Sequence, residues 1–363
     1  MKTVFVGMSG GVDSSVTAAL LKSQGYRVVG VYMQNWTRDV GGVECPWRKD
    51  LADARAVAAH LDIPLRVFDF QKEYKAKVVD YMVAEYRAGR TPNPDVMCNQ
   101  EIKFNLFLNT ALEAGADLIA TGHYAGIVDG QLLKGRDQSK DQSYFLYRID
   151  RRALEKTLMP IGELQKPEVR SQASELGLPT AAKPDSQGIC FVGEVGVRPF
   201  LSQYIDAEPG PITLQDGRVI GQHAGAIFYT IGQRHGLGVG GGRPFYVVAK
   251  DMATNTVVVT PNPDDLELYC DEFAIESAHW LGEAPDPNRG YQVVTRYRGQ
   301  PVGCRVRVEG LGYRVEMAKA DRAITPGQSA VIYDGDVVIG GGIVASARPA
   351  TLVSEAARAT IPL

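Results

Sequence analysis

The first third of the chain alternates short apolar runs with longer stretches in which apolar residues recur at helical spacing. The apolar runs have the length of strands and cover Thr3–Val6, Val28–Tyr32, Leu65–Phe68 and Leu118–Thr121. The helical spacing covers Ser14–Ser23, Leu51–His60, Tyr74–Tyr86 and Glu101–Ala114. Because this alternation is typical of a parallel sheet with helices on its faces, we expect an α/β domain over residues 1–204.

Three irregular segments interrupt this pattern, and loops of such folds often carry function. Residues 90–99 hold two prolines, which predicts a loop that opens a helix near Asn99. Residues 136–143 are polar and charged. Residues 183–193 surround Cys190 with proline and glycine.

Beyond about residue 205, short alternating strands replace the helical periodicity. Turn signals separate them at Asp216–Gly217, Gly240–Gly242, Thr254–Asn255, Gly310–Gly312 and Asp334–Gly335. We expect a small β-rich central domain over residues 205–268, a β-barrel over residues 269–347 and a tail over residues 348–363.

Composition narrows the class of protein. The 363 residues are 45% hydrophobic and 22% charged, which is an ordinary globular mix. No apolar run reaches the roughly 18 residues that a membrane span needs, and the N-terminus has no signal-peptide pattern. The five cysteines lie far apart, without zinc-ligand or disulfide spacing, so we expect a reducing compartment and no metal site formed by the protein itself. Together with the lack of a membrane span, this predicts a cytoplasmic protein without membrane contact. The net charge of −3 leaves room only for a local basic patch.

The strongest local signal lies between the first strand and the first helix: Gly7-Met8-Ser9-Gly10-Gly11-Val12-Asp13-Ser14-Ser15. Glycines let backbone N–H groups close on phosphate oxygens, and the helix N-terminus adds positive potential. The segment lacks both the Walker A lysine and the dinucleotide-fold glycine spacing. Its Ser-Gly-Gly-x-Asp-Ser core resembles the PP-loop of ATP pyrophosphatases. That resemblance implies ATP with Mg²⁺ as the ligand, bound by residues 7–14, and an adenylated intermediate formed with release of pyrophosphate.

Longer blocks narrow the substrate. They are Thr91–Phe104, Ala120–Tyr124, Lys140–Leu146, Asp185–Gly193 and Tyr229–Gly238. These blocks resemble the bacterial tRNA-specific 2-thiouridylases, the MnmA family, and the resemblance runs from residue 3 to about 345. Gln100 and Gln187 depart from that family pattern, but these departures leave both Cys98 and Cys190 in place.

The resemblance implies an adenine-nucleotide α hydrolase-like domain that thiolates the wobble uridine, U34, of lysine, glutamate and glutamine tRNAs, with release of AMP and pyrophosphate. Chemistry agrees, because the oxygen at C2 of uridine must be activated before a sulfur nucleophile can replace it. Cysteine suits that task once the pKa of its thiol is lowered. Expected partners are tRNA and a sulfur donor protein, either a cysteine desulfurase or a relay protein.

The resemblance also assigns residues to roles. Cys190 carries a persulfide and Cys98 is the nucleophile that attacks it, while Asp95 is close enough in sequence to Cys98 to move a proton. The remaining roles are target-base contacts for Asn93, Pro94 and Asp95, nucleotide contacts for Met33 and Gly122, catalysis for Asp13, and tRNA contacts for His123, Lys140, Asp141, Gln142, Tyr297, Arg298 and Gln328.

Independent arguments bear on some of these residues. Placed just before a helix, Cys98 gains from the positive end of the helix dipole, which favours its thiolate. We read Cys45, Cys270 and Cys304 as small buried hydrophobes. Between residues 296 and 314, five arginines stand against the single acid Glu309, which suits RNA phosphates.

Two other functions remain open at this stage. A pyrophosphatase-type ligase acting on a small metabolite explains the PP-loop but leaves both loop cysteines idle. A non-catalytic RNA-binding protein with a relic nucleotide site leaves Ser9 and Asp13 unexplained. An iron–sulfur cluster on Cys98 and Cys190 lacks a nearby third cysteine. The sequence does not identify the sulfur donor or the oligomeric state.

Overall fold

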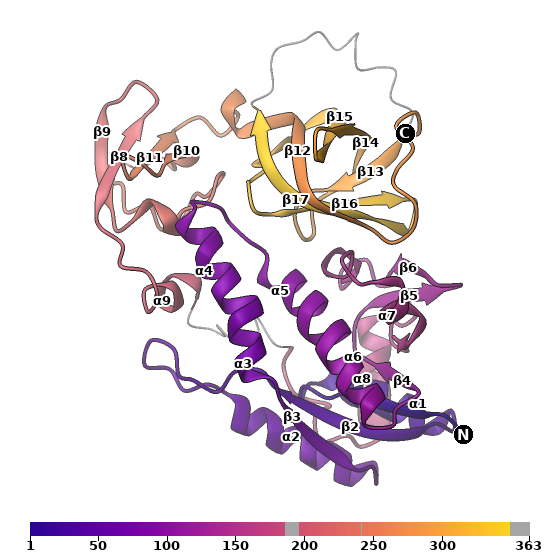
Figure 1. Ribbon diagram of the computed structural model, residues 1–363. Coiled ribbons are helices and arrows are strands. Elements are labelled where there is room, and N and C mark those ends of the chain that lie inside the picture. The colour runs from indigo at the N-terminus through magenta and orange to yellow at the C-terminus, as the bar shows by residue number, and fades with distance from the viewer. Residues whose placement is uncertain (186–195, 241, 349–363) are drawn as a thin grey trace. The chain divides into compact units, whose positions relative to one another are not determined.

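The computed structural model describes residues 1–185, 196–240 and 242–348 (Figure 1). The chain divides into two compact units. The first comprises residues 1–80, 94–200 and 336–338, and the second comprises residues 81–93, 201–335 and those from 339 onward.

A five-stranded parallel sheet, in the order β3-β2-β1-β4-β7, forms the centre of the first unit. Its strands are β1 (Thr3–Gly7), β2 (Arg27–Gln34), β3 (Leu65–Asp69), β4 (Leu118–Ala120) and β7 (Thr157–Leu158). The first four confirm the strands predicted from apolar runs, whereas the two-residue β7 was not predicted. The strand order reverses between β1 and β4, so their carboxyl ends open at a switch point.

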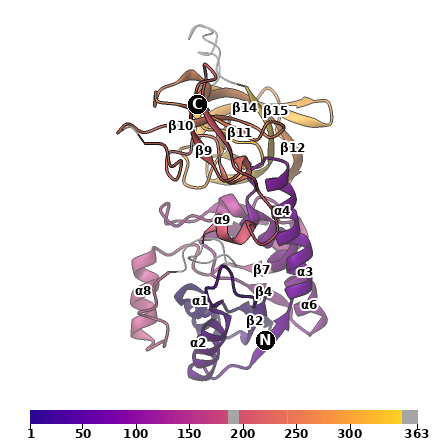
Figure 2. The same cartoon turned by 90° about the vertical axis from the view of Figure 1, so that its left-hand side faces the viewer.

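Helices cover both faces of this sheet (Figures 1 and 2). The helices α1 (Val12–Ser23) and α2 (Trp47–His60) lie on one face, and α8 (Lys166–Glu175) packs against α1. A continuous helix over residues 94–113 lies on the other face and contacts β4. It consists of α5 (Pro94–Met97), the π-helical stretch η2 (Cys98–Phe107) and α6 (Leu108–Glu113).

The start of that long helix corrects the sequence analysis. The helix begins at Pro94, not near Asn99 as predicted. A proline is tolerated in the first turn of a helix because its missing N–H needs no partner there. Cys98 therefore lies inside the helix rather than just before it, and the expected help from the helix dipole is weaker, since that field fades beyond the first turn.

Smaller elements complete the first unit and its borders. They are α3 (Gln71–Tyr74), η1 (Lys75–Val79), α4 (Asp80–Arg87), β5 (Ala125–Val128), β6 (Gln131–Lys134), η3 (Ser143–Phe145), α7 (Arg151–Glu155) and α9 (Val197–Leu201). The strands β5 and β6 form a hairpin that the sequence pattern did not predict.

The second unit contains a small mixed sheet in the order β10-β11-β8-β9. Its elements are β8 (Gly210–Leu214), β9 (Val219–His223), η5 (Ala226–Phe228), β10 (Tyr246–Asp251) and β11 (Thr256–Thr260). It has an apolar cluster of its own around Val247, Val257 and Val259. The short helix η6 (Leu266–Leu268) follows.

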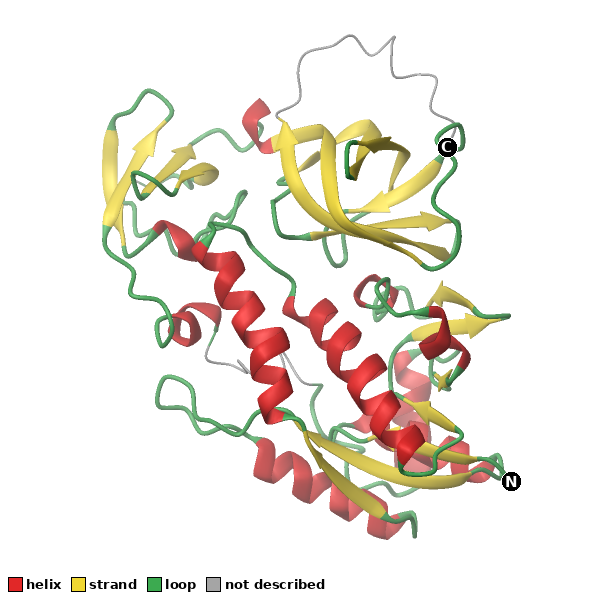
Figure 3. Ribbon diagram, in the orientation of Figure 1, coloured by secondary structure: helices red, strands yellow, loops and turns green. Residues whose placement is uncertain are grey.

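A β-barrel follows the small sheet (Figure 3). Its strands are β12 (Tyr269–Trp280), β13 (Tyr291–Val294), β14 (Val302–Glu309), β15 (Gly312–Arg322), β16 (Ser329–Asp334) and β17 (Val337–Arg348). The order is β12-β15-β14-β13-β16-β17, and β17 pairs back with β12 to close the barrel. Cys270 and Cys304 lie in its core, as predicted, whereas Cys45 in the first unit is only partly buried, so the same prediction was wrong for Cys45. Burial raises the pKa of the Cys304 thiol to about 12. The domain limits at residues 204, 268 and 347 stay predictions.

Candidate active site

The loop between β1 and α1 is folded as a cradle for an anion. Gly10 has φ +76°, and a Cβ there would lie 2.4 Å from the backbone oxygen of Asp50, so only glycine fits. The hydroxyl of Ser14 donates to the carbonyl of Gly11 (3.1 Å) and accepts from the backbone N–H of Ser9 (3.2 Å). With α1 starting at once, this geometry suits a phosphate group.

Residues from three strands meet beside this cradle. Gly122, just after β4, touches the start of α1, because a Cβ on it would lie 2.8 Å from the backbone of Asp13 and Ser14. On the other side, the methyl group of Met33 lies 3.0 Å from the place of a Cβ on Gly7. The structure thus gathers the predicted nucleotide contacts at the switch point of the sheet.

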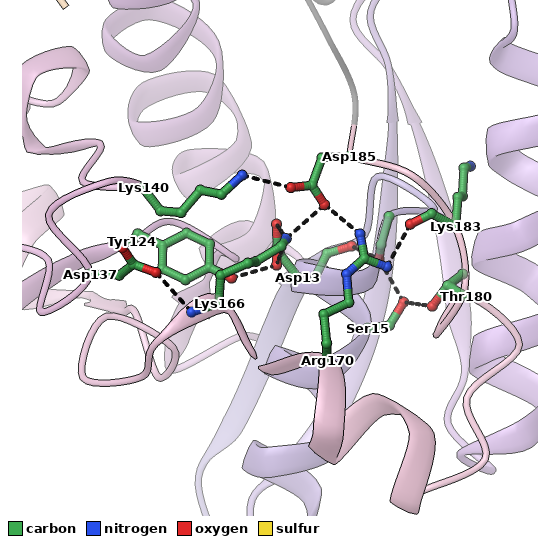
Figure 4. A network of polar contacts seen from close by, with 12 residues as sticks. Asp13, Ser15, Tyr124, Asp137, Lys140, Lys166, Arg170, Thr180, Lys183 and Asp185 are labelled. Atoms are coloured by element: carbon green, nitrogen blue, oxygen red, sulfur yellow. Dashed lines mark hydrogen bonds and ion pairs between the residues drawn. The ribbon is translucent and has the colours of Figure 1, made fainter. Parts of the chain in front are cut away.

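Asp13 is the centre of a polar network (Figure 4). Its carboxylate accepts hydrogen bonds from the ammonium of Lys166 (2.7 and 2.9 Å) and from the hydroxyl of Tyr124 (2.8 Å). Burial, followed by the charge of Asp13, raises the pKa of Tyr124 well above its ordinary value, so the tyrosine stays a donor. Lys166 also pairs with Asp185 (2.8 Å). Sequence reasoning missed Tyr124, Lys166 and the role of Asp185, because these partners lie far from Asp13 along the chain.

The three predicted tRNA contacts at residues 140–142 have partners within the first unit. Lys140 pairs with Asp185 at 2.8 Å. The carboxylate of Asp141 accepts from the backbone N–H groups of Gly135 (2.8 Å) and Ser143 (3.1 Å), and the side-chain oxygen of Gln142 accepts from the N–H of Tyr124 (3.0 Å). These contacts shape the loop, and the tRNA role of the three residues stays a prediction.

A second polar group joins the helix over residues 94–113 to the end of β4. His123 is buried, with Nδ1 at 2.7 Å from the hydroxyl of Thr121 and Nε2 at 3.4 Å from the ammonium of Lys103. An ammonium has no acceptor, so Nε2 accepts and Nδ1–H donates to Thr121. Burial, reinforced by the charge of Lys103, lowers the pKa of His123 well below its ordinary value. His123 is therefore neutral here, and its tRNA contact stays a prediction.

Lys103 also acts on Asp95, the predicted base contact. Burial raises the pKa of Asp95, and the charge of Lys103 offsets only part of this rise. Cys98 follows Asp95 by three positions in the same helix, which puts both on one side of that helix. Cys98 is 3% exposed and forms no disulfide within the described residues. Cys190 lies outside the described residues. Sequence reasoning gave Lys103 no role, although it stood inside a recognised block.

The remaining predicted contacts lie in the second unit. Arg298 is exposed, has φ +60°, and its guanidinium lies 5.2 Å from the centre of the Tyr297 ring. The side-chain amide of Gln328 donates to the carbonyl of Thr91 (2.8 Å), two residues before Asn93. Thr91 and Gln328 thus join the barrel to the segment that ends at Asn93.

The arginine patch is less positive than the sequence indicated. Arg314 pairs with Glu309 and also with Glu272 of β12, and Arg307 lies 3.5 Å from Glu316 of β15. Glu272 and Glu316 lie outside residues 296–314, the segment in which the charges were counted. That count therefore overstated the unpaired positive charge of the patch.

Two kinds of feature are absent from the described ranges. No helix there is long and apolar enough to cross a bilayer. Nor do three or more His, Cys, Asp or Glu side chains of those ranges gather as metal ligands.

Comparison with known proteins adds to this geometry. Three family descriptions match successive parts of the chain: "tRNA methyl transferase HUP domain" over residues 2–194, "tRNA methyl transferase PRC-barrel domain" over residues 198–261, and "Aminomethyltransferase beta-barrel domain" over residues 270–344.

Curated relatives match nearly the whole chain. The tRNA-specific 2-thiouridylase MnmA of Verminephrobacter eiseniae (strain EF01-2) is 49% identical, over 94% of this chain and 98% of its own. The protein of the same name from Thiobacillus denitrificans (strain ATCC 25259 / T1) is 49% identical, over 94% of this chain and 99% of its own. A solved 4-thiouridine synthetase–RNA complex with bound ATP is 18% identical and covers 53% of this chain and 45% of that chain, with a TM-score of 0.35. That likeness is too slight to carry an argument.

Proposed function

The chain belongs to the family of tRNA-specific 2-thiouridylases, and from this premise we propose how its residues thiolate tRNA at the expense of ATP. The enzyme is a sulfurtransferase of this family. In the proposed reaction, sulfur replaces the C2 oxygen of the wobble uridine, U34, in lysine, glutamate and glutamine tRNAs. ATP is cleaved, and AMP and pyrophosphate are released.

One observation carries this proposal: the anion cradle and the helix that bears Asp95 and Cys98 are joined by contacts. Gly122 touches the backbone at Asp13 and Ser14, the next residue is His123, and His123 contacts Lys103 of the helix. A nucleotide in the cradle is thereby connected to the residues expected to hold the base.

The cradle holds the phosphates. The N–H of Ser9 donates to the hydroxyl of Ser14 (3.2 Å) and the N–H of Gly11 donates to the hydroxyl of Ser9 (3.4 Å), which fixes the loop, and α1 offers a phosphate the positive end of its dipole. Magnesium usually binds through substrate phosphates and one or two carboxylates, which suits a site with Asp13 at its edge and no metal cage of protein ligands among the described residues. Mg²⁺ would supply charge neutralisation at the phosphates.

Asp95 prepares the base. Uridine carries a proton at N3, and a carboxylate that accepts it raises the electron density on the C2 oxygen. That oxygen then attacks the α-phosphorus of ATP, the bond to the pyrophosphate group breaks, and pyrophosphate leaves. Burial raises the pKa of Asp95 and works against its ionised form, and the charge of Lys103 offsets part of that rise.

The two cysteines complete the exchange. A donor protein leaves its sulfur on Cys190 as a persulfide. The thiolate of Cys98 attacks the Sγ of Cys190, the persulfide S–S bond breaks, and hydrosulfide is freed as the Cys98–Cys190 disulfide forms. Hydrosulfide adds to C2 of the adenylated uridine and AMP leaves with the original oxygen. A dithiol reductant then returns both cysteines to thiols.

An oxygen label tests this chemistry. A tRNA transcript that carries ¹⁸O at C2 of uridine 34 is incubated with the enzyme, ATP and a persulfide donor. The proposal predicts one ¹⁸O in each AMP formed and none in the pyrophosphate. Label in water or in pyrophosphate would show that the C2 oxygen never bonded to the α-phosphorus.

A further inference from the structure

Three basic side chains converge on the carboxylate of Asp185 (Figure 4). Lys140 and Lys166 each lie 2.8 Å from it, and Arg170 lies 2.6 Å from it. Burial alone would raise the pKa of Asp185, but hydrogen bonds from Lys140 and Lys166 outweigh burial and lower this pKa to about 2. One carboxylate thus neutralises only part of the charge of three cations.

The three cations have one further anionic partner in the described chain. Lys166 bridges Asp185 to Asp13, and no other ion pair of Lys140, Lys166 or Arg170 occurs among the described residues. In these ion pairs, three positive side chains thus face two carboxylates, while a third carboxylate, that of Asp137, accepts the backbone N–H of Lys166 (2.9 Å) and forms no ion pair with the three side chains among the described residues. Lys166 is also only 12% exposed, so its charge is poorly screened by water.

The cluster adjoins the anion cradle. The Lys166 ammonium that contacts Asp185 also contacts Asp13, whose backbone begins α1 behind the cradle. Lys166 and Arg170 stand four residues apart on α8, which packs against α1, so both side chains lie on one face of α8. A chain of phosphates that leaves the cradle past Asp13 meets Lys166 first.

We propose that Lys140, Lys166 and Arg170 form the binding site for the pyrophosphate part of ATP, and that the carboxylate of Asp185 occupies this site when no nucleotide is bound. This inference rests on the proposed function. Phosphate oxygens make the same charge-assisted contacts with ammonium and guanidinium groups as a carboxylate, with more negative charge. Pyrophosphate displaces Asp185, and Asp185 returns as pyrophosphate leaves.

The alternative is that Asp185 only anchors its segment. That segment has other anchors: Arg170 donates to the carbonyls of Ala181 (2.8 Å) and Lys183 (2.6 Å), and Lys183 pairs with Asp50 (2.8 Å) and Asp53 (2.6 Å). Lys183 therefore offers a matched control, because its ammonium pairs with Asp50 and Asp53 rather than with Asp185, and replacing this side chain keeps the backbone carbonyl that Arg170 contacts.

The test measures binding of inorganic pyrophosphate with Mg²⁺ to the full-length protein by calorimetry, without tRNA. Asp185→Asn removes the competing charge and should tighten binding by about threefold or more, whereas Lys166→Met should weaken it by about tenfold or more. Lys183→Met should leave it unchanged. Melting temperatures confirm that each variant is folded.

Opposite signs for Asp185→Asn and Lys166→Met support the inference. Unchanged or weaker binding by Asp185→Asn would overturn it and leave Asp185 as an anchor, and so would tighter binding by Lys183→Met. Because pyrophosphate binding needs neither tRNA nor sulfur, this outcome is independent of whether the thiolation mechanism holds.

Discussion

Two replacements of Arg298, by alanine and by glycine, should have different effects on the stability of the second unit but the same effect on its predicted affinity for tRNA. Arg298 has φ +60°, at the third position of a turn closed by a hydrogen bond from the N–H of Gly299 to the carbonyl of Arg296 (2.9 Å). That position of a turn favours glycine, and a side chain there is strained. Arg298→Ala keeps the strain and removes the guanidinium, whereas Arg298→Gly removes both.

The expected magnitudes follow from this geometry. Both variants lose the stacking of the guanidinium on Tyr297, so their difference isolates the backbone. A left-handed conformation costs a residue with a Cβ roughly 1–2 kcal/mol, and glycine gives back about 0.5–1 kcal/mol through its more flexible unfolded state. Arg298→Gly should therefore be more stable than Arg298→Ala by about 1 kcal/mol, or about 2–4 °C in melting temperature.

Binding should respond differently. If Arg298 contacts a tRNA phosphate, both variants lose affinity equally, and the log–log salt slope falls by about one unit. Filter binding over a salt series and thermal melting of the same samples measure both quantities. Equal melting temperatures of the two variants would refute the strain argument, and a wild-type salt slope would refute the phosphate contact.

Three further predictions concern the first unit. Asp13→Ala leaves Lys166 and Tyr124 without a shared partner, and it should abolish tRNA-dependent pyrophosphate release while the protein stays folded; wild-type release in a purified assay contradicts this. Lys103→Met removes the charge that lowers the pKa of Asp95. Because activity requires ionised Asp95 and is lost as pH falls through that pKa, the acidic limb of the kcat/KM profile should move to higher pH, while Lys103→Arg keeps it in place. Cys190→Ser should take up no labelled sulfur, whereas Cys98→Ser should take it up and stall. One turnover of wild type without reductant should yield a peptide that joins Cys98 to Cys190, and free thiols alongside product would exclude the disulfide step.

The sequence predicted β1, β2 and β4 well because most of their residues are buried, whereas the edge strand β3 is largely exposed. Buried strands read as continuous apolar runs, as in Val28–Tyr32, and glycine turns bound them. The same rule misses β7, since two residues form no pattern. The start of the long helix was wrong because Pro94 was read as a helix breaker, although it stands where a helix accepts proline.

The site was only partly predictable. The cradle is local, so a nine-residue segment carries most of its geometry. The network around Asp13 is not, because Tyr124 and Lys166 reach it from elements far along the chain. The charge of the arginine patch was also predicted only in part. Glu272 lies on β12, which pairs with β15, and Glu316 lies on β15 just beyond residue 314, so a count over residues 296–314 includes neither acid.

In the proposed reaction, this chain places sulfur at C2 of the wobble uridine. Mass analysis of nucleosides from the tRNAs of cells that lack this protein tests it most directly, with wild-type and Cys190→Ser chains returned on a plasmid. We expect 2-thiouridine derivatives to disappear in the deleted cells, to return with the wild-type chain, and to stay absent with Cys190→Ser. Normal 2-thiouridine in the deleted cells, with no second enzyme of this kind present, would contradict this expectation.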